Sequence, residues 1–275
     1  MRKYAINTED WLGAFEGISA RVKEAVVPLL GTEVGSRELS RGAGGDLTVE
    51  LDQRAETVAL DQLRALSATG QRFSVLSEEA GLLELGAEWP RVLLDPVDGS
   101  LNAKRGLPVA GLILAVLEGP TLAELSLGHV TNLVSGERWH AIRGAGAFRD
   151  GERIAPMRAA PPGRIELVGT ESPTRELFDL APLLRHVSRL RLLGSIAISL
   201  VHTATGGVDV YASPMRTRIF DSAASALIVR EAGGLVTDLE GRSLEGMPID
   251  LSTRTTLLAS AHPDLHRLAL DLLGD

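Results

Sequence analysis

Cysteine is missing from this chain of 275 residues. Its absence excludes disulfide bridges, zinc or iron–sulfur sites built on cysteine, and thiol nucleophiles. Basic residues are also few relative to acids: 28 Lys and Arg stand against 36 Asp and Glu, for a formal net charge of −8. Because a nucleic-acid surface needs clustered positive charge to meet the phosphates, we expect no nucleic-acid partner.

Long hydrophobic runs are absent as well. The longest apolar stretch, residues 109–117, is far too short to span a bilayer. The first 17 residues lack an apolar core of signal-peptide length. We therefore expect a cytoplasmic protein with no membrane partner. Its 44% of hydrophobic residues is typical of a globular chain with one large domain or two units around a shared core.

The spacing of apolar residues predicts a mixture of helices and strands. We expect a mobile loop over 31–45, and helices over 9–30, 52–66, 174–184, 195–205, 220–232 and 263–273. The expected strands are 73–76, 91–94, 109–118, 121–130, 137–141, 147–154, 165–169, 189–193, 208–211, 235–237 and 256–259. This order favours an α/β (α+β) fold of sheets layered with helices. The Ala- and Pro-rich residues 159–163 suggest a boundary between subdomains 1–158 and 159–275.

Acidic residues follow apolar strands or open helices at four places. They are Asp46 with Asp52, Glu78 with Glu79, Asp95 with Asp98, and Asp221. Each motif alone is typical of a turn, a helix cap or a solvated acidic pair. Together they are better explained by a shared site, because ordinary turns do not need acidic pairs after apolar strands elsewhere in the chain.

The segment 93–100, Leu-Leu-Asp-Pro-Val-Asp-Gly-Ser, is the most informative. Pro96 forces a sharp turn after the apolar run, so Asp95 and Asp98 can point to one spot. Gly99 permits a backbone approach that a Cβ would block. Clustered carboxylates repel each other, and a hard divalent cation removes that cost. Oxygen-only ligands favour Mg²⁺, Mn²⁺ or Ca²⁺ over zinc.

These residues resemble the inositol monophosphatase superfamily, which includes inositol monophosphatases, fructose-1,6-bisphosphatases and 3′-phosphoadenosine 5′-phosphate phosphatases. Four blocks carry the resemblance in family order: 45–52, 77–79, 95–102 and 220–234. The resemblance implies a layered αβαβα sandwich with the site between its halves. The N-terminal half would carry most metal ligands, and the C-terminal half would carry Asp221 and residues on the substrate side. It also implies a phosphate monoester hydrolase that needs no covalent phosphoenzyme.

The resemblance further implies a role for individual residues. Glu78, Asp95 and the carbonyl of Val97 would hold one Mg²⁺. Asp95, Asp98 and Asp221 would hold a second, while Glu78 with waters could hold a third, and Mn²⁺ could replace Mg²⁺. The backbone at Gly99 and Ser100 would cradle the substrate phosphate, and Asp98 would also contact the substrate. A metal-bound water would be oriented by Ser100 and by Asp46 or Thr48, and Glu79 would support the ligands from behind.

The substrate is expected to be a small phosphorylated polyol or sugar: inositol monophosphate, fructose 1,6-bisphosphate or both. Residues 211–221 lack the acid that binds inositol hydroxyls in animal-type enzymes, and they carry Arg216 and Arg218. This stretch resembles archaeal-type enzymes that accept both substrates, where basic residues can meet a second phosphate. The alternative is that both arginines are solvated. Gly194 and Ser195 resemble a substrate-contacting turn, with simple helix capping as the alternative.

Two other functions stay open. One is a phosphatase acting on the 3′- or 2′-phosphate of a nucleotide, although aromatic residues that could hold adenine make up only 4% of the chain. The other is a non-catalytic regulator that binds a metal or a sugar phosphate, which should have lost at least one ligand carboxylate. The resemblance also implies a homodimer, with contacts that residues 109–130 could supply, and inhibition by lithium.

Overall fold

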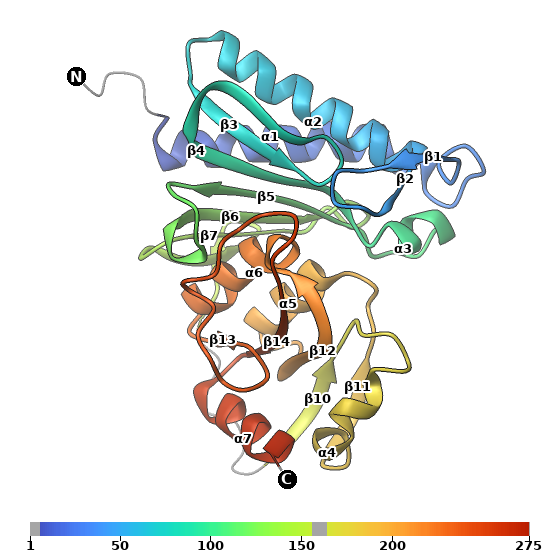
Figure 1. The fold of residues 1–275 in the computed structure, drawn as a ribbon, viewed down its shortest axis with the longest axis vertical. Coiled ribbons are helices and arrows are strands. Elements are labelled where there is room, and N and C mark those ends of the chain that lie inside the picture. Colours follow the sequence, from blue (N-terminus) through green and yellow to red (C-terminus); the bar gives the residue numbers. More distant parts are fainter. Residues whose placement is uncertain (1–5, 156–163, 275) are drawn as a thin grey trace.

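The structure, a computed structural model, describes residues 6–155 and 164–274. Helices and sheets alternate in five layers (Figure 1). The α-helices are α1 (Thr8–Val26), α2 (Glu50–Ala68), α3 (Ser100–Arg105), α4 (Ala181–Leu184), α5 (Ile196–Ala204), α6 (Ile219–Glu231) and α7 (Pro263–Gly274). Short 3-10 helices are η1 (Val27–Leu29), η2 (Leu122–Glu124) and η3 (Leu177–Leu180).

The outermost N-terminal layer consists of α1 and α2, which lie side by side in Figure 1. Asn7 begins α1, because its side chain accepts a hydrogen bond from the Asp10 backbone N–H at 2.8 Å. Trp11, Phe15 and Ile18 recur at helical spacing and are buried against the sheet below. The amphipathic pattern of α1 therefore sets which face of the helix meets the sheet.

The second layer is a seven-stranded sheet of order β3-β4-β5-β6-β7-β8-β9. Its strands are β3 (Phe73–Ser77), β4 (Gly81–Asp98), β5 (Gly111–Leu117), β6 (Leu125–Asn132), β7 (Arg138–Ile142), β8 (Gly146–Arg149) and β9 (Glu152–Arg153). Every residue of β5 is buried, because helices cover both faces of the sheet. The side chains of this strand are therefore not available for the intersubunit contact that the sequence suggested for residues 109–130.

The third layer, α5 and α6, separates the two large sheets. In α6 the residues from Ile219 to Val229 are all buried, since the helix packs against strands of both sheets. This explains why the apolar residues of α6 are not confined to one face. One hydrophobic core joins side chains of the first sheet, these helices and the second sheet.

The fourth layer is a five-stranded sheet of order β11-β10-β12-β14-β13, covered on its outer face by α4 and α7. Its strands are β10 (Ile165–Gly169), β11 (Val187–Arg191), β12 (Val210–Arg218), β13 (Leu235–Thr237) and β14 (Arg254–Ser260). β10 pairs in parallel with β11 and β12, whereas β14 is antiparallel to both of its neighbours. The predicted αβαβα sandwich is thus confirmed.

Several local expectations were wrong. Residues 31–45 contain β1 (Glu38–Arg41), which pairs with β2 (Leu47–Val49) as a separate two-stranded sheet. Residues 122–124 form a 3-10 turn ahead of β6 rather than the start of a strand. The helix expected over 174–184 is broken into η3 and α4, with Pro182 in the first turn of α4. The boundary expected at 159–163 lies outside the described residues, and the division into two subdomains stays a prediction.

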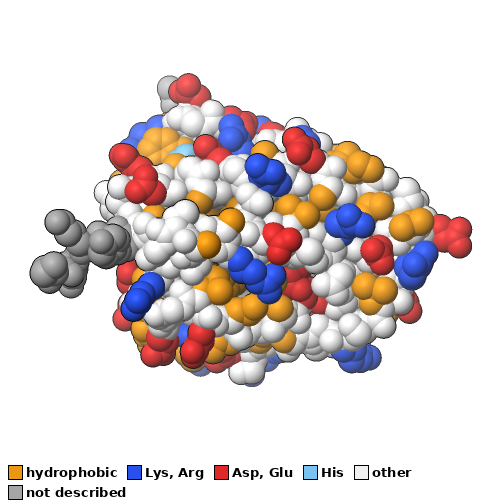
Figure 2. Space-filling view, turned by 90° about the horizontal axis from the view of Figure 1, so that it is seen from above, with side chains coloured by type: hydrophobic (Ala, Val, Ile, Leu, Met, Phe, Trp, Pro, Cys, Tyr) orange, Lys and Arg blue, Asp and Glu red, His pale blue; other side chains and the backbone are white. Residues whose placement is uncertain are grey.

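The surface on the α1 and α2 side carries mixed charge (Figure 2). Acidic and basic side chains alternate over this face, with small apolar groups between them. Within the described residues, every helix is too short or too polar to cross a bilayer.

Candidate active site

A cavity of about 260 Å³ opens where the end of β4, the start of α6 and the β1–β2 connection meet. Most of the predicted site residues line it, although they come from segments far apart in the sequence. The lining residues are Asp46, Leu47, Asp52, Glu78, Glu79, Asp95, Val97, Asp98, Gly99, Ser100, Ile196, Arg218 and Asp221. Four predicted residues are not part of this lining: Thr48, Gly194, Ser195 and Arg216.

The turn after β4 gives the cavity its floor. Asp95 is 2% exposed, and its Oδ1 accepts a hydrogen bond from the Val97 backbone N–H at 3.1 Å. Gly99 has φ 96°, and a Cβ there would lie 2.7 Å from the carbonyl oxygen of Gly194. Glycine is therefore required at this position both for its backbone angle and for the close approach of the other half of the molecule.

Asp98 is held by the beginning of α5. Its Oδ2 accepts hydrogen bonds from the Ser195 hydroxyl at 2.6 Å and from the Ala197 backbone N–H at 2.7 Å. Ser195 also accepts a hydrogen bond from the Ile198 N–H at 3.1 Å, so it caps this helix. The turn of Gly194 and Ser195 thus orients a predicted metal ligand from the C-terminal half.

The carboxylates of the cavity repel one another in a poorly solvated place. Burial, with the neighbouring charges of Glu78, Asp98 and Asp221, raises the pKa of Asp95 well above its usual range. Burial also raises the pKa of Asp98 to about 6 and that of Asp221 to about 7. Buried acids shifted in this way are typical of a site that receives a cation or a proton.

These donors fit a hard divalent ion by their chemistry, because carboxylate and carbonyl oxygens are the ligands that Mg²⁺ and Mn²⁺ prefer. Their present arrangement is more open. Within residues 6–155 and 164–274, no three Asp, Glu or His side chains surround one point as the ligands of a single ion would. A side chain of opposite charge, Arg218, lies among them.

Arg218 is turned toward the carboxylates. Its Nε donates to both oxygens of Asp221 at 3.0 Å, and its Nη2 donates to Glu78 Oε1 at 2.5 Å. Arg216, two residues earlier on β12, is exposed, and its Nη2 donates to the Arg254 carbonyl at 3.1 Å. Contact of either arginine with a second phosphate stays a prediction.

Two hydroxyl groups near the cavity each contact a carboxylate. Ser100 Oγ lies 2.9 Å from Asp52 Oδ1 and 2.9 Å from the Val97 carbonyl oxygen. The Thr48 hydroxyl donates to Glu79 Oε2. Burial raises the pKa of Asp52 to about 6 and that of Glu79 to about 7. Both pairs could receive a proton near neutral pH.

Asp46 is placed differently from these pairs. Its side chain is 71% exposed, and its Oδ2 lies 3.2 Å from Arg218 Nη1. The carboxylate that contacts Ser100 is Asp52, which the sequence places in the same block without giving it a role in catalysis. The participation of Asp46 in water activation stays a prediction.

The sequence reasoning also missed Glu171. Its Oε1 accepts a hydrogen bond from the Leu193 N–H at 2.9 Å, and its Oε2 accepts one from the Gly194 N–H at 2.7 Å. Ser199 donates to the same carboxylate at 2.5 Å. Glu171 therefore fixes the turn that holds Asp98. The signal was present, because Glu171 is an acid that closely follows an apolar strand, as the other site acids do.

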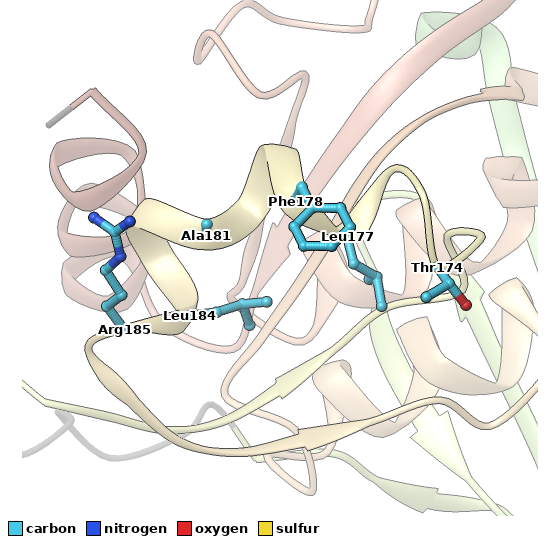
Figure 3. Close-up of a pocket in the computed structure, with 6 residues that line it drawn as sticks. All are labelled: Thr174, Leu177, Phe178, Ala181, Leu184 and Arg185. Carbon is cyan, nitrogen blue, oxygen red and sulfur yellow. The ribbon is translucent and has the colours of Figure 1, made fainter.

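A second hollow of about 380 Å³ lies beside η3 and α4, and Figure 3 shows its lining. Apolar side chains dominate, including Phe178, which is 76% exposed. Its one charged side chain is Arg185. The hollow therefore offers no carboxylate, and the acidic chemistry belongs to the cavity at the end of β4.

The chain is similar in sequence to known phosphatases along nearly its whole length. Residues 9–274 match the model described as the inositol monophosphatase family. A fructose-1,6-bisphosphatase/inositol-1-monophosphatase of Methanothermobacter thermautotrophicus is 34% identical over 274 residues, which cover 96% of each chain. A bifunctional NADP phosphatase/NAD kinase of Methanococcus maripaludis is 27% identical over 97% of this chain and 50% of that protein.

Solved structures agree with the sequence matches. The structure of an inositol monophosphatase–fructose 1,6-bisphosphatase superposes with a TM-score of 0.83 at 25% identity, covering 95% of this chain and 99% of that one. A Thermotoga maritima IMPase superposes with a TM-score of 0.80 at 26% identity, covering 96% and 97% of the two chains.

Proposed function

Because the chain belongs to the inositol monophosphatase family, whose members are phosphoric monoester hydrolases, we propose that it is a Mg²⁺-dependent phosphatase. Its substrate would be inositol monophosphate, fructose 1,6-bisphosphate or both. The supporting observation is that the buried Asp95 and Asp221 and the half-buried Asp98 line one cavity, next to the turn at Gly99 and Ser100. Such a group of acids is unfavourable without a cation and well suited to phosphoryl transfer with one.

Two or three divalent ions would be held by Glu78, Asp95, the Val97 carbonyl, Asp98 and Asp221. When bound, they would lower the pKa of a water molecule and neutralise charge that develops on the phosphate and the leaving oxygen. Mn²⁺ could take the same oxygen ligands.

The protein groups would orient the reactants. Ser100, in contact with Asp52, is placed to accept a hydrogen bond from the attacking water and to direct its oxygen at phosphorus. Thr48 with Glu79 is the second hydroxyl–carboxylate pair that could take this role. The backbone at Gly99 and Ser100 would bind the phosphate, because a glycine there leaves the peptide groups accessible. Asp98, fixed by Ser195, would hold its place beside the substrate.

Two observations bear on the substrate. Basic residues before Asp221 and the names of the archaeal relatives favour a sugar bisphosphate or inositol phosphate. The NADP phosphatase relative favours a nucleotide 2′-phosphate as the second candidate. A purely binding protein is disfavoured, because the five carboxylates Asp46, Glu78, Asp95, Asp98 and Asp221 are all retained.

The test is phosphate release from inositol 1-phosphate, fructose 1,6-bisphosphate, 3′-phosphoadenosine 5′-phosphate and NADP⁺, each with Mg²⁺ and with EDTA. We expect Mg²⁺-dependent release from one or both of the first two. Release from the nucleotides alone would move the assignment to the second candidate. No release from any substrate by a folded, metal-loaded sample would contradict the proposal.

A further inference from the structure

Arg218 makes an unusual number of polar contacts for one side chain. Besides Asp221 and Glu78, its Nη1 lies 3.2 Å from Asp46 Oδ2 and 3.3 Å from the Gly44 carbonyl oxygen. The side chain is only 7% exposed. A guanidinium group keeps its proton in proteins even when it is buried. The guanidinium is therefore a permanent positive charge inside the acidic cavity.

The surrounding backbone leaves room for this guanidinium. A Cβ added at Gly44 would lie 2.3 Å from Arg218 Nη1. The N–H of Gly44 donates to the Glu78 carbonyl at 2.7 Å, which keeps the loop against the end of β3. Arg218 thus packs between the loop, the end of the first sheet at Glu78, and α6.

The contacted groups are the ones that a divalent ion would need. Arg218 approaches both oxygens of Asp221 and one oxygen of Glu78. Nitrogen donors at these distances and a metal ion cannot share the same lone pairs. Within the described residues no three acidic or histidine side chains gather as the ligands of one ion would, and Arg218 is the cation that contacts both Glu78 and Asp221.

We propose that Arg218 is an internal cation that competes with divalent metal ions for Glu78 and Asp221. The inference rests on the metal site of the proposed function and deepens it. In the metal-free protein Arg218 neutralises part of the buried negative charge and joins the halves of the site. A divalent ion that binds Glu78 and Asp221 must compete with these hydrogen bonds and approach the positive charge of Arg218.

Competition predicts two effects of opposite sign when Arg218 is removed. The metal-free protein should become less stable, because a buried ion pair loses one partner. Divalent ions should bind more tightly, because no arginine hydrogen bonds compete for the same carboxylates and one repelling positive charge is gone. A residue with only a structural role would weaken both properties when it is removed.

The experiment compares the full chain with its Arg218→Gln and Arg218→Lys variants. Arg216→Gln is the matched control, since it removes the same charge from an exposed position on the same strand. Mn²⁺ affinity is measured by isothermal titration calorimetry, and the melting temperature is measured in EDTA. For Arg218→Gln we expect about a tenfold or greater decrease in the Mn²⁺ dissociation constant together with a lower melting temperature. This fold-change follows the usual size of coupling between sites.

Each outcome is decisive. Arg218→Lys keeps the charge without the planar fork, so its affinity should fall between those of the wild type and Arg218→Gln. If Arg218→Gln does not fold, the Mn²⁺ affinity of Arg218→Lys is compared with that of the wild type instead. Equal or weaker Mn²⁺ binding by both Arg218 variants, with normal binding by the wild type, would overturn the competition and leave the proposed function intact. If neither the wild type nor the variants bind Mn²⁺, the metal requirement of the proposed function itself fails.

Discussion

The two loops that meet at the cavity are built in different ways. The turn from Asp95 to Ser100 is buried at residues 95–97 and half-buried at residues 98–100, and hydrogen bonds fix both of its acids. The connection from Gly42 to Asp46 follows β1, whose four residues are all exposed. It is held by backbone hydrogen bonds to residues 78 and 79 and by Arg218.

This difference separates two tasks within one site. The turn supplies three of the five predicted metal ligands, Asp95, Val97 and Asp98, and the core on both sides sets its geometry. The exposed connection brings Asp46 to the site, and its position depends on a few polar contacts. Segments with few buried apolar contacts open locally at low free-energy cost. We therefore expect substitutions in the turn to affect the whole fold and catalysis, and substitutions in the connection to act locally.

The largest effect should come from Asp95→Asn at the centre of the turn. The substitution removes the carboxylate predicted to bridge two metal ions, so we expect turnover to fall roughly a thousandfold or more. The metal-free protein should keep or raise its melting temperature, because a buried charge that repels Glu78, Asp98 and Asp221 is gone. Phosphate release and thermal unfolding in EDTA measure the two effects. Substantial remaining turnover would contradict the assigned role of Asp95.

Alanine substitutions at two glycines, one in each loop, allow the two loops to be compared directly. Gly99 in the turn and Gly45 in the connection have φ 96° and φ 93°, so alanine at either position costs about 1 kcal/mol for its backbone angle. A Cβ at Gly45 meets nothing within 4 Å, whereas one at Gly99 lies 2.7 Å from the Gly194 carbonyl oxygen. We expect Gly99→Ala to destabilise the fold by about 1–3 kcal/mol more than Gly45→Ala, as overpacking does. Chemical denaturation measures this difference, and equal losses would show that the turn can relax as easily as the connection.

The difference between the turn and the connection also explains which features the sequence predicts well. Asp95, Asp98 and Gly99 lie in one short segment after an apolar run, so their convergence follows from local chain geometry. Central strands such as β5 and β6 are largely buried and carry a clear apolar signal, and the layered fold could be predicted from such strands. β1 was missed because all four of its residues are exposed and no hydrophobic pattern marks it.

Contacts between distant segments could not be predicted in this way. Arg218 meets Glu78 across 140 residues and Gly44 across 174 residues. Ser100 meets Asp52 across 48 residues. Local periodicity identifies which side chains are available, but the packing of the layers decides which of them meet. For this reason the sequence indicated that Arg218 could contact a phosphate and gave no sign that it binds the carboxylates.

The smallest of the predicted effects is the pH dependence of stability that comes from Glu79, which contacts the connection. Burial raises the pKa of Glu79 from 4.5 to about 7 in the folded protein, and Glu79 accepts a hydrogen bond from Thr48. A carboxyl whose pKa is raised by folding contributes stability that is fully present below its unfolded pKa and is lost as pH rises through the folded value. In EDTA, the melting temperature should therefore fall between about pH 5 and pH 8.

Asp52 and Asp221, with pKa values of about 6 and 7, contribute to the same fall in stability. Glu79→Gln removes one of these groups, so the decrease in melting temperature from pH 5 to pH 8 should become smaller but not vanish. Glu240→Gln, at an exposed position whose side chain pairs with Arg242, is the control and should leave the decrease unchanged. If Glu79→Gln melts with the same pH dependence as the wild type, Glu79 is already ionised in the folded protein, and the connection is held against the site without a buried proton.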